Sequence, residues 1–278
     1  MSFRTYHAVT GTDASQLGGQ VEAQRQRVRA RLQAVRRVVA VASGKGGVGK
    51  SWITVALALG AAARGQRVAL LDADLKAPTA ARLLGASGPL RVDEHGVHPA
   101  EGRGGVRVLS SDLLLSDGAP LMWRARTGDD FAWRTLLETG MLRELLGDGA
   151  WGELDLLLVD LPPDVDRLAD LAALAPSLAG VVMVTIPSEE SRAAVRRALR
   201  RASDAGIPLL GVVENMAGQR CARCGEVSPL FAGDAGAWLS GEFAVPLLAR
   251  VPFAPGALDD PDSRVLADLR DALRRVLR

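Results

Sequence analysis

Residues 44–51 read GKGGVGKS and lie between an apolar run and a stretch rich in alanine and leucine. The spacing fits G-x-x-x-x-G-K-[ST], and a strand before it and a helix after it are the context that this motif requires. Glycines let the backbone N–H groups turn toward phosphate oxygens, and a helix that begins near Lys50 adds the positive end of its dipole. The sequence therefore predicts a phosphate-binding loop that joins a strand to a helix.

Short apolar runs recur along the chain, and helical stretches fall between several of them. The runs cover residues 38–42, 67–71, 106–109, 154–159, 181–186 and 209–213. Continuous apolar strands separated by helices are typical of a mostly parallel sheet with helices on both faces. We expect helices at residues 52–64 and 188–205 and an irregular, turn-rich excursion at residues 86–105. The predicted fold class is α/β.

The two ends of the chain predict helices of different character. Residues 1–12 form a loose end, and residues 15–37 combine a thin apolar face with several arginines. We expect residues 1–37 to be a tail and an Arg-rich helix laid on one domain, residues 38–278, which contains the phosphate loop. The apolar stripe of residues 263–278 predicts a packed terminal helix. Contact with a membrane surface is the alternative for both helices.

Composition excludes several classes of protein. The 34 basic and 32 acidic residues nearly cancel, which argues against a dedicated nucleic-acid surface. No apolar run reaches the ~20 residues that span a bilayer, and the first residues lack the apolar core of a signal peptide. Two cysteines are too few for a disulfide framework. We therefore expect a cytoplasmic protein, with membrane contact unfavoured but not excluded.

Carboxylates end two of the predicted strands. Asp72 and Asp74 follow the second apolar run, and Asp160 follows the fourth. The carboxyl ends of parallel strands meet at the crevice where ligands bind. There Lys50 would reach the β- and γ-phosphates, the Ser51 hydroxyl would bind Mg²⁺, Asp160 would hold Mg²⁺ through water, and Asp74 would orient the attacking water. The loop residues expected to bind the nucleotide are Gly44, Lys45, Gly46, Gly47, Val48, Gly49, Lys50 and Ser51.

Cys221 and Cys224 form the pattern C-x-x-C-G, a tight knuckle that directs two thiolates at one point. Tetrahedral metal sites and iron–sulfur clusters usually take four ligands. The three histidines, His7, His95 and His98, lie far away in the sequence. One chain therefore supplies half a site, and a symmetric dimer would supply the rest. A zinc ion and a redox-active dithiol stay open as alternatives to a cluster.

Lys45 adds a second lysine early in the loop, and only three of the 34 basic residues are lysines. This loop resembles the deviant Walker A signature of dimerising P-loop ATPases such as MinD, ParA and nitrogenase iron protein. Residues 38–255 further resemble the Mrp/ApbC family of iron–sulfur cluster carrier ATPases. The matching segments are SGKGGVGKS at 43–51, DADLKAPT at 72–79, Trp123-Arg124, ELDLLLVDLPP at 153–163, GIPLLGVVENM at 206–216, the C-x-x-C at 221–224 and ARVPFAP at 249–255.

The resemblance implies a P-loop ATPase that binds and hydrolyses MgATP as a homodimer. Lys45 would reach across the dimer to the partner's nucleotide, and the amide of Asn215 would read the adenine edge. Cys221 and Cys224 would hold a [4Fe–4S] cluster that bridges two subunits. The partners would be the recipient apoproteins, to which the cluster is passed, and iron–sulfur assembly proteins. One rival is a positioning ATPase of the MinD/ParA kind that acts at membrane or DNA. Another is a nucleotide-gated binding module with little hydrolysis.

Three segments depart from the family pattern. Asp164 stands where the family has glycine, and Arg167 stands where it has aspartate. Lys76 replaces a tyrosine, and Arg124-Ala125-Arg126 replaces R-G-P. A carboxylate at residue 164 brings negative charge toward the γ-phosphate. We therefore expect nucleotide binding to survive and hydrolysis to be slow or dependent on a partner.

Overall fold

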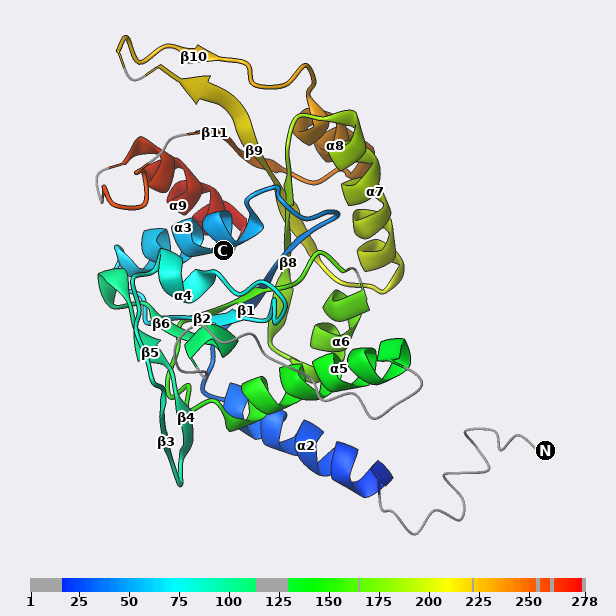
Figure 1. The fold of residues 1–278 in the computed structure, drawn as a ribbon. Coiled ribbons are helices and arrows are strands. Elements are labelled where there is room, and N and C mark those ends of the chain that lie inside the picture. Colours follow the sequence, from blue (N-terminus) through cyan, green and yellow to red (C-terminus); the bar gives the residue numbers. More distant parts are fainter. Residues whose placement is uncertain are drawn as a thin grey trace, which may run out of the picture.

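The computed structural model describes residues 17–113, 130–164, 166–221, 223–253, 256–260 and 263–276. Within them, nine strands form one sheet in the order β10-β9-β8-β1-β7-β2-β6-β5, with β11 also paired to β9 (Figure 1). Its strands are β1 (Val38–Ser43), β2 (Val68–Asp72), β5 (Ala100–Glu101), β6 (Arg107–Ser110), β7 (Leu156–Asp160), β8 (Leu178–Thr185), β9 (Leu209–Arg220), β10 (Val227–Ser228) and β11 (Leu247–Phe253). The pairs that involve β10 and β5 are antiparallel, and the other pairs are parallel. The mostly parallel α/β sheet predicted from the apolar runs is confirmed.

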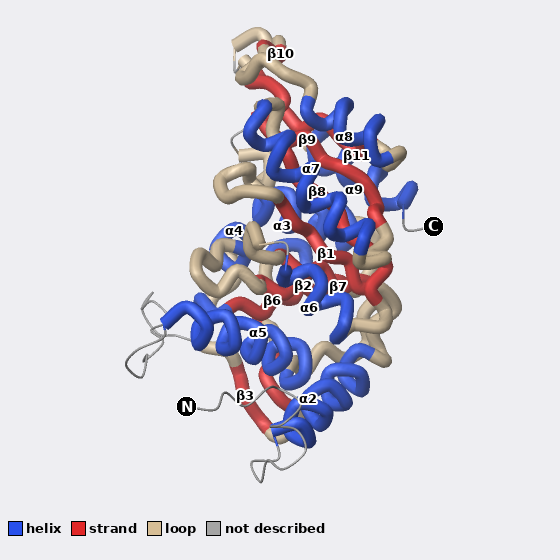
Figure 2. The backbone as a smooth tube through the Cα atoms, turned by 90° about the vertical axis from the view of Figure 1, so that its right-hand side faces the viewer, coloured by secondary structure: helices blue, strands red, loops and turns tan. Residues whose placement is uncertain are grey.

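Helices cover both faces of this sheet. One buried cluster joins the sheet to α2 (Leu17–Leu32), α5 (Asp130–Asp148), α6 (Asp166–Leu174), α7 (Glu189–Asp204) and α8 (Ala235–Phe243). The other cluster joins the opposite face to α3 (Lys50–Ala62), α4 (Ala80–Leu83) and α9 (Arg264–Val276). Figure 2 shows α5, α6 and α7 in front of the strands. Strand β1 contributes alternate residues to the two clusters, which explains why it is apolar throughout.

Both terminal helices bury their apolar residues against the domain. In α2, Val28 and Leu32 are buried beside α5. After the helix, Val35 forms a β-bridge with Leu154, just before β7. In α9, Leu269 and Leu273 are buried in the cluster that contains α3. These four residues of the apolar stripes, Val28, Leu32, Leu269 and Leu273, are therefore covered by protein. Residues 1–16 and 277–278 lie outside the described part of the chain.

The structure differs from the sequence expectations in a few segments. Residues 86–105, expected to be irregular, include a hairpin of β3 (Arg91–Asp93) and β4 (Gly96–His98), strand β5 and a 3₁₀ turn. The hairpin forms because Gly96 supplies a φ of 118° at its turn, a conformation that other residues avoid. Strand β9 is longer than the apolar run 209–213 that predicted it. Within the described residues, no helix is long and apolar enough to cross a membrane.

Candidate functional site

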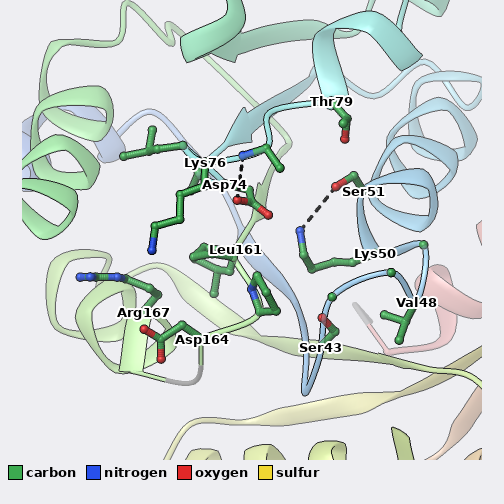
Figure 3. A pocket seen from close by; sticks show the side chains of 18 of the residues that line it. Ser43, Val48, Lys50, Ser51, Asp74, Lys76, Thr79, Leu161, Asp164 and Arg167 are labelled. Atoms are coloured by element: carbon green, nitrogen blue, oxygen red, sulfur yellow. Dashed lines mark hydrogen bonds between the residues drawn. The ribbon is translucent and has the colours of Figure 1, made fainter. Parts of the chain in front are cut away.

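A cavity of about 690 Å³ opens where β1, β2 and β7 end. Three segments line most of it: the glycine-rich loop at 43–52, residues 73–83 after β2, and residues 161–167 after β7. Figure 3 shows Lys50, Ser51 and Asp74 around this space, with Asp164 and Arg167 on its other side. The structure thus brings residues 45–51 of the predicted phosphate loop together with Asp74, whereas Gly44 does not line the cavity and packs against the backbone of Ala194 in α7.

The glycine-rich loop is held in shape by its own backbone and by Asn215. Gly49 precedes α3 with a φ of 79°. A Cβ atom at this position would collide with the Asn215 amide nitrogen, so only glycine fits. The Asn215 Nδ2 atom donates to the Val48 carbonyl over 2.9 Å. Asn215 is therefore packed beneath the loop, is nearly buried and is not among the residues that line the cavity.

Lys50 and Asp160 form a buried ion pair at the base of the cavity. The Lys50 ammonium donates to Asp160 Oδ1 over 2.8 Å, and the Thr54 hydroxyl donates to the same oxygen over 2.8 Å. The Ser51 hydroxyl lies 3.5 Å from the Lys50 ammonium. Asp160 Oδ2 is fully buried and has no hydrogen-bond partner among the described residues. A buried carboxylate oxygen without a hydrogen-bond partner suits Mg²⁺, which prefers oxygen ligands.

Asp72 is a buried carboxylate that sequence reasoning placed at a strand end without giving it a role. Its side chain is fully buried and accepts from the backbone N–H groups of Asp74, Thr79 and Ala80 and from the Ser110 hydroxyl. Burial and the neighbouring negative charge of Asp160 raise the pKa of Asp72 to about 7. Its position at the end of the second apolar run was the sequence signal, but its hydrogen-bond partners depend on the fold.

Three residues that depart from the family pattern, Lys76, Asp164 and Arg167, line the cavity. Asp164 is exposed, and its carboxylate accepts from the Asp166 backbone N–H over 3.1 Å. Arg167 is buried, donates to the Thr139 hydroxyl and lies 3.0 Å from the Asp170 carboxylate. The Lys76 side chain extends toward Asp164 and Arg167 in Figure 3. The Trp123 and Arg124–Arg126 positions lie outside the described residues.

Cys221 and Cys224 lie in the turn between β9 and β10, and both thiols are free and exposed. We call residues 219–228 the cysteine hairpin, of which Ala222 lies outside the described part. The Cys221 backbone N–H donates to the Glu226 carbonyl, and the Gly225 N–H donates to the Cys221 carbonyl. Hydrogen bonds from the backbone N–H groups of Cys224 and Arg223 hold the pKa of Cys221 below its usual value. A stabilised thiolate is the form that binds metal.

The rest of the described chain adds no third metal ligand to the cysteine hairpin. Within those residues, no group of three or more His, Cys, Asp and Glu side chains could hold a metal ion. His95 and His98 belong to the β3–β4 hairpin, which lies at the opposite end of the molecule from β10 (Figure 1). His98 instead contacts the Asp93 carboxylate over 2.7 Å. Within the described residues, the cysteine hairpin therefore offers two thiols and no histidine ligand.

A family model described as a ParA-type NUBPL iron-transfer P-loop NTPase matches residues 34–272. The chain belongs to this family. The match covers the glycine-rich loop, both acidic strand ends and the cysteine hairpin. The resemblance recognised from the motifs is thereby confirmed.

Several relatives carry names that refer to iron–sulfur clusters. An iron-sulfur cluster carrier protein of Saccharolobus solfataricus is 35% identical, with 90% of this chain and 82% of that protein covered. An iron-sulfur cluster carrier protein of Methanococcus maripaludis is 34% identical, with 93% of this chain and 85% of that protein covered. The cytosolic Fe-S cluster assembly factor CFD1 of Chaetomium globosum is 38% identical, with 81% of this chain and 76% of that protein covered.

Solved structures give the same fold. A nucleotide-binding protein of Archaeoglobus fulgidus, solved with ADP, is 34% identical, covers 91% of this chain and 92% of its own, and has a TM-score of 0.69. The cell-division ATPase MinD of Pyrococcus furiosus is 20% identical with a TM-score of 0.56, covering 87% and 99%. The second similarity extends to the fold alone. The P-loop NTPase fold expected from the deviant loop is confirmed.

Proposed function

We propose that this protein is an ATP-dependent carrier of iron–sulfur clusters, which binds a [4Fe–4S] cluster as a homodimer and passes it to recipient apoproteins. The observation that carries the proposal is one chain with two sites: a phosphate-loop cavity with a buried Lys50–Asp160 pair, and an exposed hairpin with two free thiols. Relatives that cover most of the chain and are named as cluster carriers support it. The working unit is residues 38–278 in the cytoplasm, preceded by the tail and Arg-rich helix of residues 1–37, of which α2 (Leu17–Leu32) packs on the domain.

MgATP is the substrate that the cavity fits. Lys50 neutralises the β- and γ-phosphates, and the Ser51 hydroxyl and Asp160 hold Mg²⁺. Mg²⁺ held there would supply positive charge to offset the negative charge that develops on the γ-phosphate oxygens. Asp74 lies in the facing segment, with its carboxylate at the cavity, where it orients the attacking water. Lys45 also lines the cavity, which leaves it accessible to a partner's nucleotide in a dimer.

The cluster is the cargo, and each chain offers two of its four thiolates. Four large apolar side chains on and beside the cysteine hairpin are exposed: Val227 by 44%, Leu230 by 40%, Phe231 by 39% and Phe253 by 46%. Phe253 pairs with Gln219, at the start of the hairpin. A second copy that covers these side chains would bring its own Cys221 and Cys224 to the same point.

Anaerobic reconstitution with iron and sulfide tests the cluster. About four iron atoms and four sulfides per dimer are expected, and almost none in the Cys221→Ala/Cys224→Ala double variant. Ser228→Ala, on the same hairpin, is the matched control and should retain the metal. Bound zinc without sulfide would assign a structural zinc site instead. A reversible disulfide with no metal would assign a redox-active dithiol.

The second candidate, a nucleotide-gated binding module with little hydrolysis, is favoured by one observation. The Asp164 carboxylate lies at the mouth of the cavity, where the family has glycine. Measuring ATP turnover alongside ADP binding separates the two functions. Turnover that disappears in Lys45→Met while ADP still binds supports the ATPase. Tight ADP binding with no turnover in the wild type supports the module.

A further inference from the structure

The Asp72 carboxylate joins the cavity segment of residues 73–83 to strand β6. Its Oδ2 atom accepts from the Thr79 and Ala80 N–H groups, each over 3.0 Å, and from the Ser110 hydroxyl over 3.2 Å. Its Oδ1 atom accepts from the Asp74 N–H over 3.3 Å. Asp72 itself does not line the cavity. It therefore acts on the site through the backbone of other residues.

These bonds fix both ends of the loop that carries Asp74. At its start, the Ala73 N–H donates to the Asp160 carbonyl over 2.9 Å. At its end, helix α4 has four residues, and its N-cap residue Thr79 makes no side-chain capping bond. So short a helix does not hold its own shape. Asp72 supplies the missing cap from the neighbouring strand, and so determines where residues 74–79 face the cavity.

We propose that Asp72 is a positioning residue for ATP hydrolysis, whose carboxylate holds the loop of residues 73–80 so that Asp74 faces the γ-phosphate end of the cavity. The inference rests on the ATPase activity proposed above. Asp72 does not touch the nucleotide. Its effect belongs to the hydrolytic step, because the phosphate loop and the Lys50–Asp160 pair are held by other contacts.

A carboxylate is needed here because of the number of donors. Three donors converge on Oδ2 and one on Oδ1, and both oxygens of an ionised carboxylate act only as acceptors. In Asp72→Asn, one of the two positions becomes an NH₂ group that faces backbone N–H donors and cannot accept from them. A neutral Ser or Asn caps an ordinary helix as well. Burying a charge beside Asp160 is costly, so simple capping does not explain its presence.

The test compares wild type, Asp72→Asn and Ser110→Ala. Ser110→Ala removes one donor and leaves the three backbone bonds, so it is the graded control. For each protein, ADP affinity, kcat, KM and the amide hydrogen exchange of Thr79 and Ala80 are measured. In Asp72→Asn, we expect exchange at both amides to accelerate and kcat to fall by about tenfold or more, which is about 1.4 kcal/mol. ADP affinity should change by less than about threefold, and Ser110→Ala should show the same pattern with a smaller fall in kcat.

Several results would overturn the inference. One is a folded Asp72→Asn variant with unchanged kcat, and another is equal loss of ADP affinity and turnover, which would mean general collapse of the site. If Asp72→Asn does not fold, Ser110→Ala decides, and an unchanged kcat there refutes the role. A wild type that binds ADP but never hydrolyses ATP refutes the proposed ATPase activity itself. That result differs from an active wild type that tolerates Asp72→Asn.

Discussion

Two lysines of one loop occupy different environments. Lys50 is buried against Asp160, whereas Lys45 is partly exposed at the cavity. Removing one partner of a buried pair leaves an uncompensated charge, while a side chain at the surface contributes little to folding. The sequence motif presents both residues as nucleotide ligands. Burial separates their contributions to stability.

Lys50→Met is expected to lower the free energy of unfolding by about 3–5 kcal/mol, because Asp160 stays buried without its cation. ADP binding should be lost. Lys45→Met is the control, and its free energy of unfolding should stay within about 0.5 kcal/mol of wild type. Urea denaturation and fluorescent ADP binding measure both effects. Equal destabilisation by the two substitutions would contradict the assigned burial.

Asp164→Gly is expected to raise ATP turnover. Its exposed carboxylate lies at the cavity and repels the γ-phosphate as charge develops there. Removing about 1.4 kcal/mol of repulsion corresponds to a tenfold higher kcat. Asp164→Asn separates the effects, since it removes the charge and keeps an acceptor for the Asp166 N–H. If neither variant turns over faster than wild type, Asp164 does not limit hydrolysis.

Strand β9 connects the two sites of the molecule. Asn215 supports the phosphate loop through Val48, and β9 ends at Arg220, next to Cys221. Between them, Met216 has a φ of 53°, a left-handed conformation unusual for a residue other than glycine. The pairing with β11 shifts there, because Val251 pairs with Asn215 and Phe253 pairs with Gln219. The strand is therefore irregular between the nucleotide loop and the cysteines.

Asn215→Ala tests what this strand does for the nucleotide. Because its Nδ2 atom donates to the Val48 carbonyl, we expect ADP and GDP affinity to fall together, by about tenfold, as the loop loosens. Gln219→Ala, exposed on the same strand, is the control and should bind as wild type does. A loss confined to ADP would instead support the adenine-reading role predicted from the sequence. Titration with both nucleotides distinguishes the two roles.

Substitutions in helix α9 test whether the C-terminal apolar stripe belongs to the core. Leu269 is fully buried in the cluster with α3. Leu269→Ala should therefore lower the free energy of unfolding by about 2–5 kcal/mol. Arg264→Ala, on the exposed side of the same helix, should change it by less than about 0.5 kcal/mol. A stable Leu269→Ala variant that loses vesicle binding shown by wild type would instead support a membrane-binding helix.

The sequence predicted those elements whose burial leaves a simple pattern. Strands β1, β2, β7 and β8 are buried on both faces, so each is a continuous apolar run that can be recognised in the sequence. Strand β11 was missed because only Leu248 and Val251 of its seven residues are buried and because it contains Pro252. The candidate site was predictable where glycines and lysines form a motif. The role of Asp72 was not, because its donors Thr79, Ala80 and Ser110 come together only in the folded chain.

At the scale of the whole molecule, the nucleotide cavity and the cysteine hairpin lie in one chain but use different surfaces. The hairpin projects beyond the helical layers in Figure 1, at the β10 end of the sheet. Exposed apolar side chains lie on and beside the hairpin that carries the two free thiols, and two thiolates are half of the four that an iron–sulfur cluster usually takes. A homodimer joined at this hairpin would bury the apolar surface and complete the ligand set together.

This arrangement predicts that dimerisation and cluster binding depend on the same apolar side chains. Leu230→Glu/Phe231→Glu places two charges beside the cysteines and should yield a monomer after reconstitution, with far less iron than the roughly four atoms per dimer expected of wild type. Val92→Glu is the matched control, because Val92 is 65% exposed on the distant β3–β4 hairpin. Light scattering and iron analysis measure both quantities, and ADP binding verifies that each variant is folded. A double variant that stays dimeric with its full complement of iron would place the dimer contact elsewhere, since charged side chains cannot be buried in an apolar interface without a large cost.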